Sequence, residues 1–527
     1  MISTTSQASR SPLRLDPQAP YYKWLIAGVI LLASATQIFA GTSLNLAIPR
    51  LMVTFGTDLA ATQWVATGFL VTRTLVIPLL GWLGSIMGNR TLFVVIMSGF
   101  VLTSLGCGLA SSLGMLVLFR LLQGAVMGPI EGLTAVILVQ IFPPRQRGLA
   151  VGLRSIGWST GELLFYTIGA YFLENISWRF LFFLGIPSGI LSIILGWLLL
   201  PQQEETRNPS VDYPGIIFLG SFLVPLLLTI SFARNSETAF ATLLLLGSGA
   251  LLGGGLFVLW EWRTRFPAIN LQLFRYPTFC LLCGTAFFNN MGLFGGLFMV
   301  PIFLQQVIGL TPLQASLLML PALPFSAISG PITGRLSDLA PPPLVAVGGL
   351  LALAIVFYLF ASISAVTTVL VLIGYLILYR TFMDTVGVPV TALTVQSLPP
   401  QDVRMGQGLV GVVRSIGASL GVTVTSVFFE RRREWHQLDT YARYDNTSAS
   451  HIETVHDFRF MLQDVGVVGA GVEPITLSAL SQQLDIEAIA TSFQESFLLI
   501  CLCFFLAMLP MLWLFYRMRY TREHVTP

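Results

Sequence analysis

The chain has 527 residues, of which 54% are hydrophobic and only 10% charged. Because soluble domains carry about 25% charged residues, this composition excludes an ordinary soluble protein and predicts an integral membrane protein. The formal net charge of +3 is too small for nucleic acid to be an expected partner.

Fourteen apolar segments follow one another along the chain, each at least as long as the roughly 20 residues that a helix needs to cross a bilayer. They lie at 23–48, 58–83, 91–110, 114–141, 148–173, 178–200, 213–233, 240–262, 276–308, 313–336, 343–362, 366–397, 405–429 and 491–516. The arginines between these segments follow the positive-inside rule when the chain starts inside. We therefore expect both termini to be cytoplasmic.

Two halves of the chain are related in sequence. The stretch LFRLLQGAVMGPIEGLT at 118–134 aligns with LYRTFMDTVGVPVTALT at 378–394 at a constant offset of 260 residues. Each stretch is followed by a Pro-Pro pair and then by the tetrapeptide RSIG. We expect a cytoplasmic tail (1–22), an N-terminal six-helix bundle (23–200), a linker with two inserted transmembrane helices (201–275) and a C-terminal six-helix bundle (276–527). The last domain includes a polar outer loop at 431–490 and a cytoplasmic tail.

Two related halves of six helices resemble the major facilitator superfamily. The stretch GWLGSIMGNR at 81–90 is similar to that family's loop motif, and LFRLLQG at 118–124 is similar to its span-4 motif. With fourteen spans, TQWVATGFLV at 62–71 and VPIFLQQVIGLTPLQASLLMLP at 300–321, the chain resembles the fourteen-helix drug:proton antiporters of the EmrB/QacA type. The resemblance implies an all-α membrane protein with the major facilitator fold, built from two pseudo-symmetric six-helix bundles plus two inserted helices.

The resemblance also implies a function. We expect a transporter that exports amphipathic or cationic small molecules by alternating access, through proton-coupled antiport. The alternative is a specific exporter or an uncoupled facilitator of a single metabolite or lipid. Departures from the family motifs favour this alternative, because Ser85 and Ala40 replace aspartates and Phe165-Tyr166 replaces the Gly-Pro of the span-5 antiporter motif.

A location and partners are implied by the same resemblance. The stretches FFERRREWHQLD at 428–439 and FQESF at 493–497 resemble the EmrB branch, whose members often work with a periplasmic adaptor. The outer loop at 431–490 is therefore a candidate docking segment, although a solvated cap without a partner is equally consistent with its composition. We expect a monomer in the inner (cell) membrane of a bacterium.

Four ionisable residues fall near the middle of the predicted spans: Arg73, Glu131, Glu162 and Asp384. At 1.5 Å per residue they lie about 18–22 Å from the cytoplasmic loops, where charged groups are costly and indicate functional sites. In this superfamily the first and fourth helices of each half line the cavity, so Glu131 and Asp384 are candidate proton and substrate carboxylates. The alternative is a buried ion pair, such as Arg73–Glu131, that only holds helices together.

Further polar residues are candidates for the cavity and for a cytoplasmic gate. Candidate substrate contacts, which could equally tie helices together, are Asn45, Arg120, Asn289, Asn290, Gln305, Gln306 and Arg380. The two RSIG arginines are expected to lie at shallow depth, as part of a gate made of Ser85, Arg90, Arg154, Asp338 and Arg414. On the family analogy, Arg154 meets Asp338 and Arg414 faces Ser85.

The sequence contains no nucleotide-binding loop, catalytic triad or metal-binding motif. The five cysteines all lie within apolar segments, and the CxxC at 280–283 has no second pair or nearby histidine. Such cysteines are typical of helix packing. We therefore expect neither an enzyme nor a protein that needs a metal or a cofactor.

Overall fold

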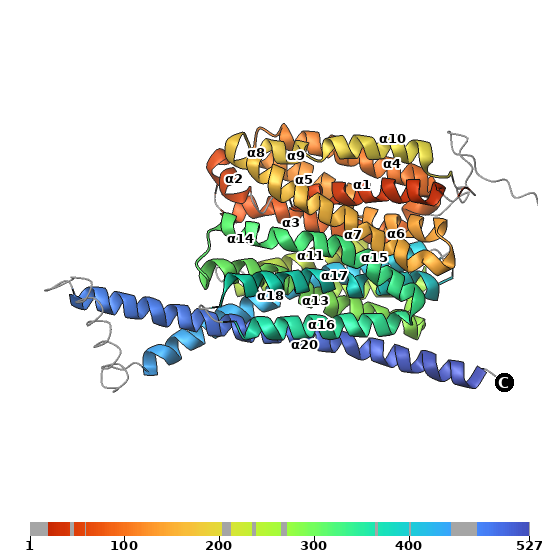
Figure 1. The fold of residues 1–527 in the computed structure, drawn as a ribbon. Helices are drawn as coiled ribbons and strands as arrows, with labels where there is room; N and C mark the ends of the chain where they lie inside the picture. The colour runs from red at the N-terminus through yellow and green to blue at the C-terminus, as the bar shows by residue number, and fades with distance from the viewer. Residues whose placement is uncertain are drawn as a thin grey trace, which may run out of the picture.

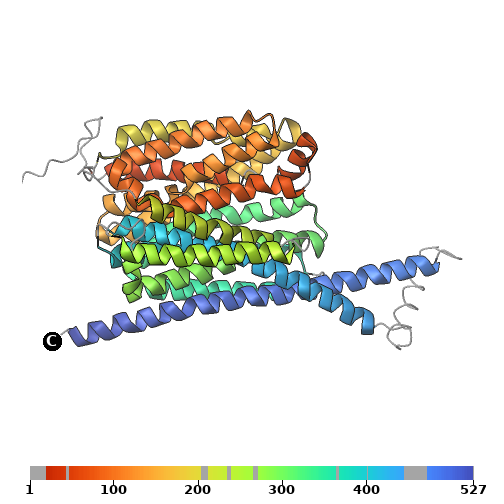
Figure 2. The ribbon, with the colours of Figure 1, turned by 180° about the vertical axis from the view of Figure 1, so that it is seen from behind.

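The helices run side by side in one bundle, and every element in the described residues is helical (Figure 1). The computed structural model describes residues 19, 21–42, 47–57, 59–202, 212–233, 239–264, 271–363, 367–399, 402–443 and 472–525. We name the two ends of the bundle by what they carry. At the terminal end α1 begins and α20 ends, and at the hairpin end α18 and α20 extend beyond the other helices (Figures 1 and 2).

The first half of the chain forms one group of helices. Its elements are α1 (Tyr22–Thr42), α2 (Ile48–Phe55), α3 (Leu59–Val76), η1 (Ile77–Leu79), α4 (Leu80–Gly108), α5 (Leu113–Met127), α6 (Ile130–Ile141), η2 (Pro144–Gln146), α7 (Arg147–Leu164), the π-helical turn η3 (Phe165–Gly169), α8 (Ala170–Asn175), α9 (Arg179–Phe183) and α10 (Ile186–Leu199). The inserted pair that follows is α11 (Tyr213–Phe232) and α12 (Phe240–Arg263).

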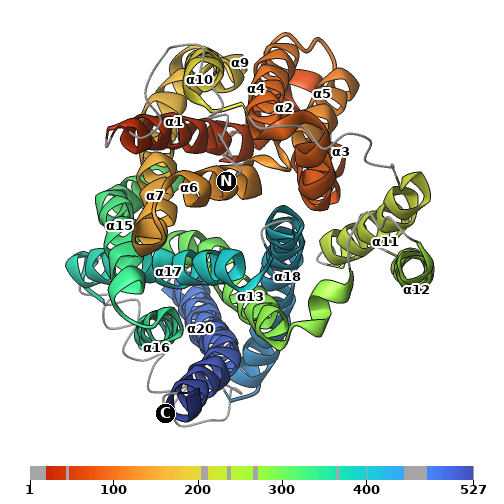
Figure 3. The same cartoon turned by 90° about the vertical axis from the view of Figure 1, so that its right-hand side faces the viewer.

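The second half forms the other group. Its elements are η4 (Leu271–Arg275), α13 (Pro277–Gln306), α14 (Pro312–Met319), η5 (Leu320–Ala322), α15 (Leu323–Leu339), α16 (Pro342–Ala361), α17 (Val369–Ser397), α18 (Val403–Arg443) and α20 (Val472–Val525). Seen along the helix axes, the two groups lie face to face (Figure 3). The inserted pair stands at one edge, where α11 contacts both α3 and α18 (Figure 3).

Twelve helical stretches in the described residues are long and apolar enough to cross a membrane. One of them, Trp64–Gly108, has 45 residues, about twice the length of a single crossing. Gly88 lies inside it with φ 69° and ψ 159°, a conformation that only glycine adopts easily, so the chain turns there. The predicted span 148–173 is helical as α7, η3 and α8 but is not among the twelve. The all-helical membrane fold is confirmed, and the count of fourteen crossings stays a prediction.

A break between α5 and α6 positions Glu131 in the interior of the bundle. Pro129 precedes α6, where its ring and missing N–H interrupt a continuous helix. Glu131 therefore falls in the first turn of α6, where the helix dipole favours a negative charge. A Cβ atom at Gly128 would lie 2.6 Å from the carbonyl oxygen of Arg73. Glycine thus lets α3 approach the break and bring Arg73 near Glu131.

The two halves meet through backbone contact between α7 and α15. A Cβ atom at Gly152 would overlap the carbonyl oxygen of Gly330, and one at Gly334 would overlap that of Gly148. Such close approach of small residues is how helices associate in membranes. On the other side of the bundle, a Cβ atom at Gly408 of α18 would lie 3.0 Å from the Ile77 carbonyl oxygen of η1. Contacts on both sides therefore close the terminal end.

The predicted outer loop at 431–490 is partly a helical hairpin, which corrects the sequence interpretation. Helix α18 continues to Arg443 and α20 begins at Val472 (Figures 1 and 2), and residues 444–471 lie outside the described part. Arg432 forms an ion pair with Glu495, and His436 Nε2 lies 3.2 Å from the same carboxylate. Polar side chains one helical turn apart on α18 thus face α20. The polar composition of this segment indicated a loop, but it belongs to helices that pair through polar contacts.

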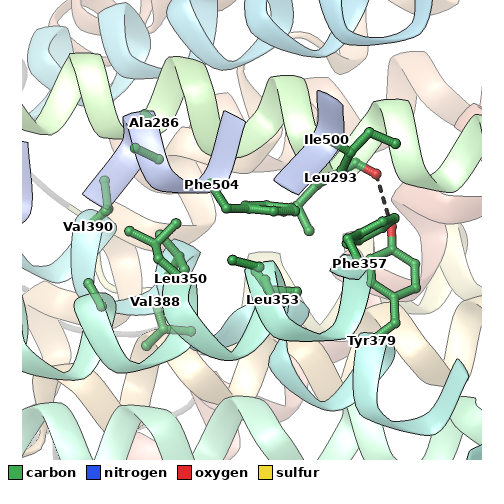
Figure 4. Packing of buried hydrophobic residues seen from close by; sticks show 14 of the residues in the cluster. Ala286, Leu293, Leu350, Leu353, Phe357, Tyr379, Val388, Val390, Ile500 and Phe504 are labelled. Atoms are coloured by element: carbon green, nitrogen blue, oxygen red, sulfur yellow. Dashed lines mark hydrogen bonds between the residues drawn. The ribbon is translucent and has the colours of Figure 1, made fainter. Parts of the chain in front are cut away.

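The core of the second half is packed around Phe357. Its ring centroid lies 5.6 Å from that of Phe504 and 5.2 Å from that of Tyr379 (Figure 4). The buried Tyr379 hydroxyl donates to the Leu293 carbonyl oxygen at 2.9 Å (Figure 4), which satisfies the polar group inside an apolar cluster. Helices α13, α16, α17 and α20 are thereby held as one unit.

Replacing Gly152 with valine should separate α7 from α15, because the added side chain has no space beside Gly330. Overpacking of this kind costs about 1–3 kcal/mol, so the unfolding temperature of the purified protein should fall. The matched control is Gly348→Val in α16, where a Cβ atom meets nothing within 4 Å. Equal effects of the two substitutions on the unfolding temperature would contradict the backbone contact.

Candidate functional site

A cavity of about 900 Å³ lies between the two halves. Its lining comes from α3, α6, α7, α11, α12, α13, α15, α17 and α18. Along α3 it extends from Ala61 to Thr74, about 20 Å at 1.5 Å per residue. Ala61 lies near the start of α3 at the hairpin end, so the cavity extends from the middle of the bundle toward that end. Its charged lining residues are Arg73, Glu131, Arg154, Asp384 and Arg414.

Glu131 lies within ion-pair distance of three arginines, which we call the three-arginine cluster: Arg73, Arg154 and Arg414. The distances are 3.2 Å from Arg73 Nη2 to Glu131 Oε2, 3.6 Å from Arg154 Nη2 to Oε1 and 3.5 Å from Arg414 Nη1 to Oε1. The side chain of Glu131 is 31% exposed, and it lines the cavity. The Arg73–Glu131 pair considered from the sequence therefore exists, but it is part of a larger group that faces open space.

The two RSIG arginines contact the same repeat position in the two halves. Arg154 Nη1 donates to the backbone oxygen of Glu131 at 3.1 Å, and Arg414 Nη2 donates to Thr391 Oγ1 at 2.7 Å. Thr391 follows Glu131 by 260 residues, as Arg414 follows Arg154. Only the first half has a carboxylate at this position, and Arg414 also reaches across to it. Two arginines at equivalent repeat positions thus converge on the one acidic side chain, Glu131.

The pairing predicted for the gate differs from the pairing in the structure. The Asp338 carboxylate accepts hydrogen bonds from the backbone N–H groups of Gly148 at 2.7 Å and Leu149 at 2.9 Å. It thus caps the first turn of α7, where unpaired N–H groups and the helix dipole favour an anion, and Arg154 contacts Glu131 instead. The Ser85 hydroxyl donates within its own helix, to the Trp82 carbonyl oxygen at 2.7 Å. The predicted pairing followed the family analogy, and the expected shallow depth of Arg154 took account of helical rise but not of the length of the arginine side chain, which reaches Glu131.

A second ion pair joins the halves deeper in the protein. Arg380 Nη1 of α17 lies 2.9 Å from Glu162 Oε2 of α7, and only 3% and 6% of these side chains are exposed. Neither residue lines the cavity. Asp384, one helical turn after Arg380, does line it, and its charge interacts with those of Arg154, Arg380 and Glu162. Asp384 therefore lies at the cavity wall, one turn of α17 away from the arginine of the buried ion pair.

The other residues predicted for the cavity are divided between two environments. Asn289 and Asn290 line the cavity. Arg120 is fully buried and donates to the backbone oxygens of Ala40 at 2.8 Å and Val65 at 3.2 Å, so it ties α5 to α1 and α3. Gln305 and Gln306 lie outside the lining. Arg90, which was predicted for the gate, also lies outside it, and its guanidinium stacks on Trp197 at 4.3 Å. Asn45 lies outside the described residues.

Sequence reasoning missed the contribution of the inserted helices. Leu227, Ser231 and Phe232 of α11 and Thr242 of α12 belong to the lining, and the Phe232 ring lies 5.9 Å from that of Trp64. No motif in α11 indicates a site, because its place beside α3 depends on tertiary contacts. In the described part of the chain, no group of three or more histidine, cysteine or acidic side chains could hold a metal ion.

Comparisons with known proteins identify relatives of this chain. The sequence model of the Major Facilitator Superfamily matches residues 30–422. The multidrug export protein EmrB of Escherichia coli (strain K12) is 28% identical over 420 residues, which are 77% of this chain and 80% of that protein. The fatty acid resistance protein FarB of Neisseria gonorrhoeae is 27% identical over 491 residues, which are 92% of this chain and 94% of that protein.

Solved structures show the same fold. The human organic anion transporter MFSD10 (TETRAN) superimposes with a TM-score of 0.61, covering 94% of this chain and 100% of that chain. Its sequence identity is 16%, so this likeness concerns the arrangement of helices and nothing further.

Replacing Asp338 with alanine should loosen the closed terminal end, because α7 loses the acceptor for two backbone N–H groups. Loss of a capping acceptor costs about 1 kcal/mol, which corresponds to about a fivefold rise in the open population. A cysteine at Val139, which is 2% exposed and packed among residues of the second half, reports that opening through its rate of maleimide labelling in a cysteine-free background. Ser85→Ala is the control, and equal labelling rates in both variants would argue against the cap.

Proposed function

Since the chain belongs to the major facilitator superfamily, we propose that it exports amphipathic small molecules by alternating access, coupled to proton movement. The observation that carries this proposal is the cavity between the halves, which contains two carboxylates in a largely apolar bundle. Its volume of about 900 Å³ falls within the range of small-molecule pockets. We propose a carrier rather than an enzyme.

The names of the relatives support an amphipathic substrate. EmrB is named for multidrug export and FarB for resistance to fatty acids. Drugs and fatty acids share apolar bodies with polar groups, and the cavity combines charged residues with Trp64, Trp158, Phe232 and Phe294. Such a lining suits ligands that carry one polar and one apolar part.

Alternating access requires the two halves to change their contacts. The cavity extends toward the hairpin end, whereas the α7–α15 and η1–α18 contacts close the terminal end. We propose that the bundles at 23–200 and 276–527 rock as units around the cavity, as in other transporters built from repeats. The backbone contacts of Gly152 and Gly408 would then separate when the terminal end opens.

Protons are proposed to act at Asp384 and Glu131. Asp384 contacts the cavity on one side, and its charge interacts with the inter-half Arg380–Glu162 pair on the other. A proton on Asp384 would change the charge balance around the pair that joins α17 to α7. Proton binding would in this way alter the contact between the halves. Movement of proton and substrate in opposite directions, which the resemblance to antiporters implies, stays a prediction.

An uncoupled facilitator of one metabolite or lipid is the second candidate. It is favoured by the π-helical turn η3 at Phe165–Gly169, which occupies the place of the altered antiporter motif. It is also favoured by Glu131, whose charge is already balanced by arginines. Transport driven by the substrate gradient alone would distinguish this candidate from the first.

The protein is an integral membrane protein whose substrates are small molecules. We further propose a monomer in the bacterial inner membrane, with both termini in the cytoplasm and the α18–α20 hairpin outside. The terminal end carries basic residues as the positive-inside rule requires, including Lys23, Arg145, Arg147, Arg335 and Arg404. The hairpin, which extends well beyond the other helices (Figure 1), is the proposed docking site for a periplasmic adaptor.

Asp384→Asn and Glu131→Gln should each abolish the dependence of transport on an imposed pH gradient, because neither amide can exchange a proton. Substrate flux in proteoliposomes measures this dependence. Asp402→Asn, outside the cavity lining, is the control, since asparagine serves as well as aspartate at a helix start. Wild-type flux that ignores the pH gradient would support the uncoupled facilitator instead.

Deleting residues 434–485 should remove adaptor binding and leave substrate binding intact, because the cavity lining lies outside this segment. The rise in unfolding temperature on adding substrate should be the same in the truncated and the full chain. Loss of this substrate-dependent rise in a variant that remains folded would contradict the separation of hairpin and cavity.

A further inference from the structure

Positive charge exceeds negative charge in the cavity lining. Three arginine side chains approach one carboxylate, Glu131, and together with Asp384 the lining holds three positive and two negative formal charges. Among the ion pairs formed by the described residues, none contains Asp384, the other carboxylate of the lining. A surplus of charge in a bundle of low polarity is costly. The arrangement therefore favours a further anion.

The three guanidinium groups together have more N–H donors than the carboxylate of Glu131 can accept. Each guanidinium has five N–H donors, whereas Glu131 offers two carboxylate oxygens. The groups contributed by Arg73, Arg154 and Arg414 keep 16–20% of their side-chain surface exposed. Arginine binds carboxylate, sulfonate and phosphate oxygens through two parallel hydrogen bonds. An anionic head group that enters the cavity could accept hydrogen bonds from guanidinium groups that already point toward one position.

Beyond the cluster, the cavity lining toward the hairpin end combines large apolar side chains with serine and threonine hydroxyls and has no charged residue. Trp64 lies nine residues before Arg73 on α3, about 14 Å away along the helix axis, and its ring meets that of Phe232. Leu70 and Leu227 line the space nearby. The cavity thus has one cationic end and one uncharged end with large apolar side chains, which suits a molecule with an anionic head and an apolar tail.

We propose that Arg73, Arg154 and Arg414 bind the anionic head group of an amphipathic substrate, and that Glu131 occupies this site in the empty protein. The substrate replaces Glu131 as the counter-ion of the arginines, while its apolar part lies toward Trp64 and Phe232. A cationic head group would instead meet the surplus positive charge. This inference narrows the substrate class of the proposed function, and it rests on that function only in taking the cavity as the substrate site.

Two probes of equal chain length test the proposal: decanesulfonate, which stays anionic, and decyltrimethylammonium, which stays cationic. Their affinities are measured by calorimetry on the full chain in nanodiscs of phosphatidylcholine, with empty nanodiscs subtracted. Decanesulfonate should bind at least about tenfold more tightly than decyltrimethylammonium. Methanesulfonate, which has the head group without the tail, should bind much more weakly than decanesulfonate.

Substitutions assign the binding to the cluster. Glu131→Gln should tighten decanesulfonate binding about tenfold, because the internal competitor is removed. Arg414→Gln should weaken binding about tenfold, and Arg414→Lys should retain part of it, since lysine keeps the charge but loses the paired donors. Asp402→Asn is the matched control and should leave both affinities unchanged.

Glu131→Gln leaves three arginines without their shared counter-ion and could therefore fail to fold. A second variant keeps the proposal testable in that case. Asp384→Asn removes a negative charge from the same cavity and keeps the Glu131 contacts. It should tighten decanesulfonate binding and weaken decyltrimethylammonium binding. Unfolding temperature and elution volume identify variants that are not folded.

The result that would overturn the proposal is tighter binding of decyltrimethylammonium, or decanesulfonate binding that neither Arg414→Gln nor Asp384→Asn changes. The assay contains no gradient and no turnover. Anion binding without proton-dependent transport would therefore contradict only the proposed coupling, whereas coupled transport of cations without anion binding would contradict only the anionic head group.

Discussion

A carboxylate shared by three arginines is the interaction on which the arrangement of the two halves depends. Glu131 belongs to the first half, as do Arg73 and Arg154, and Arg414 reaches it from the second. Charged groups are costly inside a membrane protein unless they are paired or face a water-filled space. Glu131 is paired with arginines, and all four side chains of the cluster also line the cavity. The helices that carry these residues therefore converge at the cavity wall.

Helix α7 connects this cluster to most of the contacts between the halves. From the terminal end inward, it receives a cap from Asp338, packs by its glycine backbone on α15, contacts Glu131 through Arg154, and pairs Glu162 with Arg380. At the position equivalent to Asp338 the other half has Ser85, which has no carboxylate and donates within its own helix. Opening of the terminal end must therefore break different interactions on the two sides of the bundle, and the α7 side carries the additional cap.

The charge of the ligand determines how protons can act in such a cavity. A proton on Glu131 or Asp384 removes a negative charge, which would assist the binding of an anion and oppose that of a cation. Any effect of a proton on ligand binding would therefore depend on the neighbouring arginines as well as on the carboxylates. The cavity lining holds three arginines against two carboxylates, whereas the Arg380–Glu162 pair that joins the halves carries no net charge.

The sequence by itself determined the membrane class, the helical repeat and the family, because composition, hydropathic length and the RSIG repeat are properties of the chain alone. It also placed Glu131, Arg73 and Asp384 near the middle of their predicted spans, since depth follows from counting residues along a helix. Only the tertiary structure decided that Arg154 and Arg414 meet at Glu131, that Asp338 caps α7, and that Arg120 lies away from the cavity. These outcomes depend on helix rotation and on the reach of long side chains, and helical rise alone contains neither.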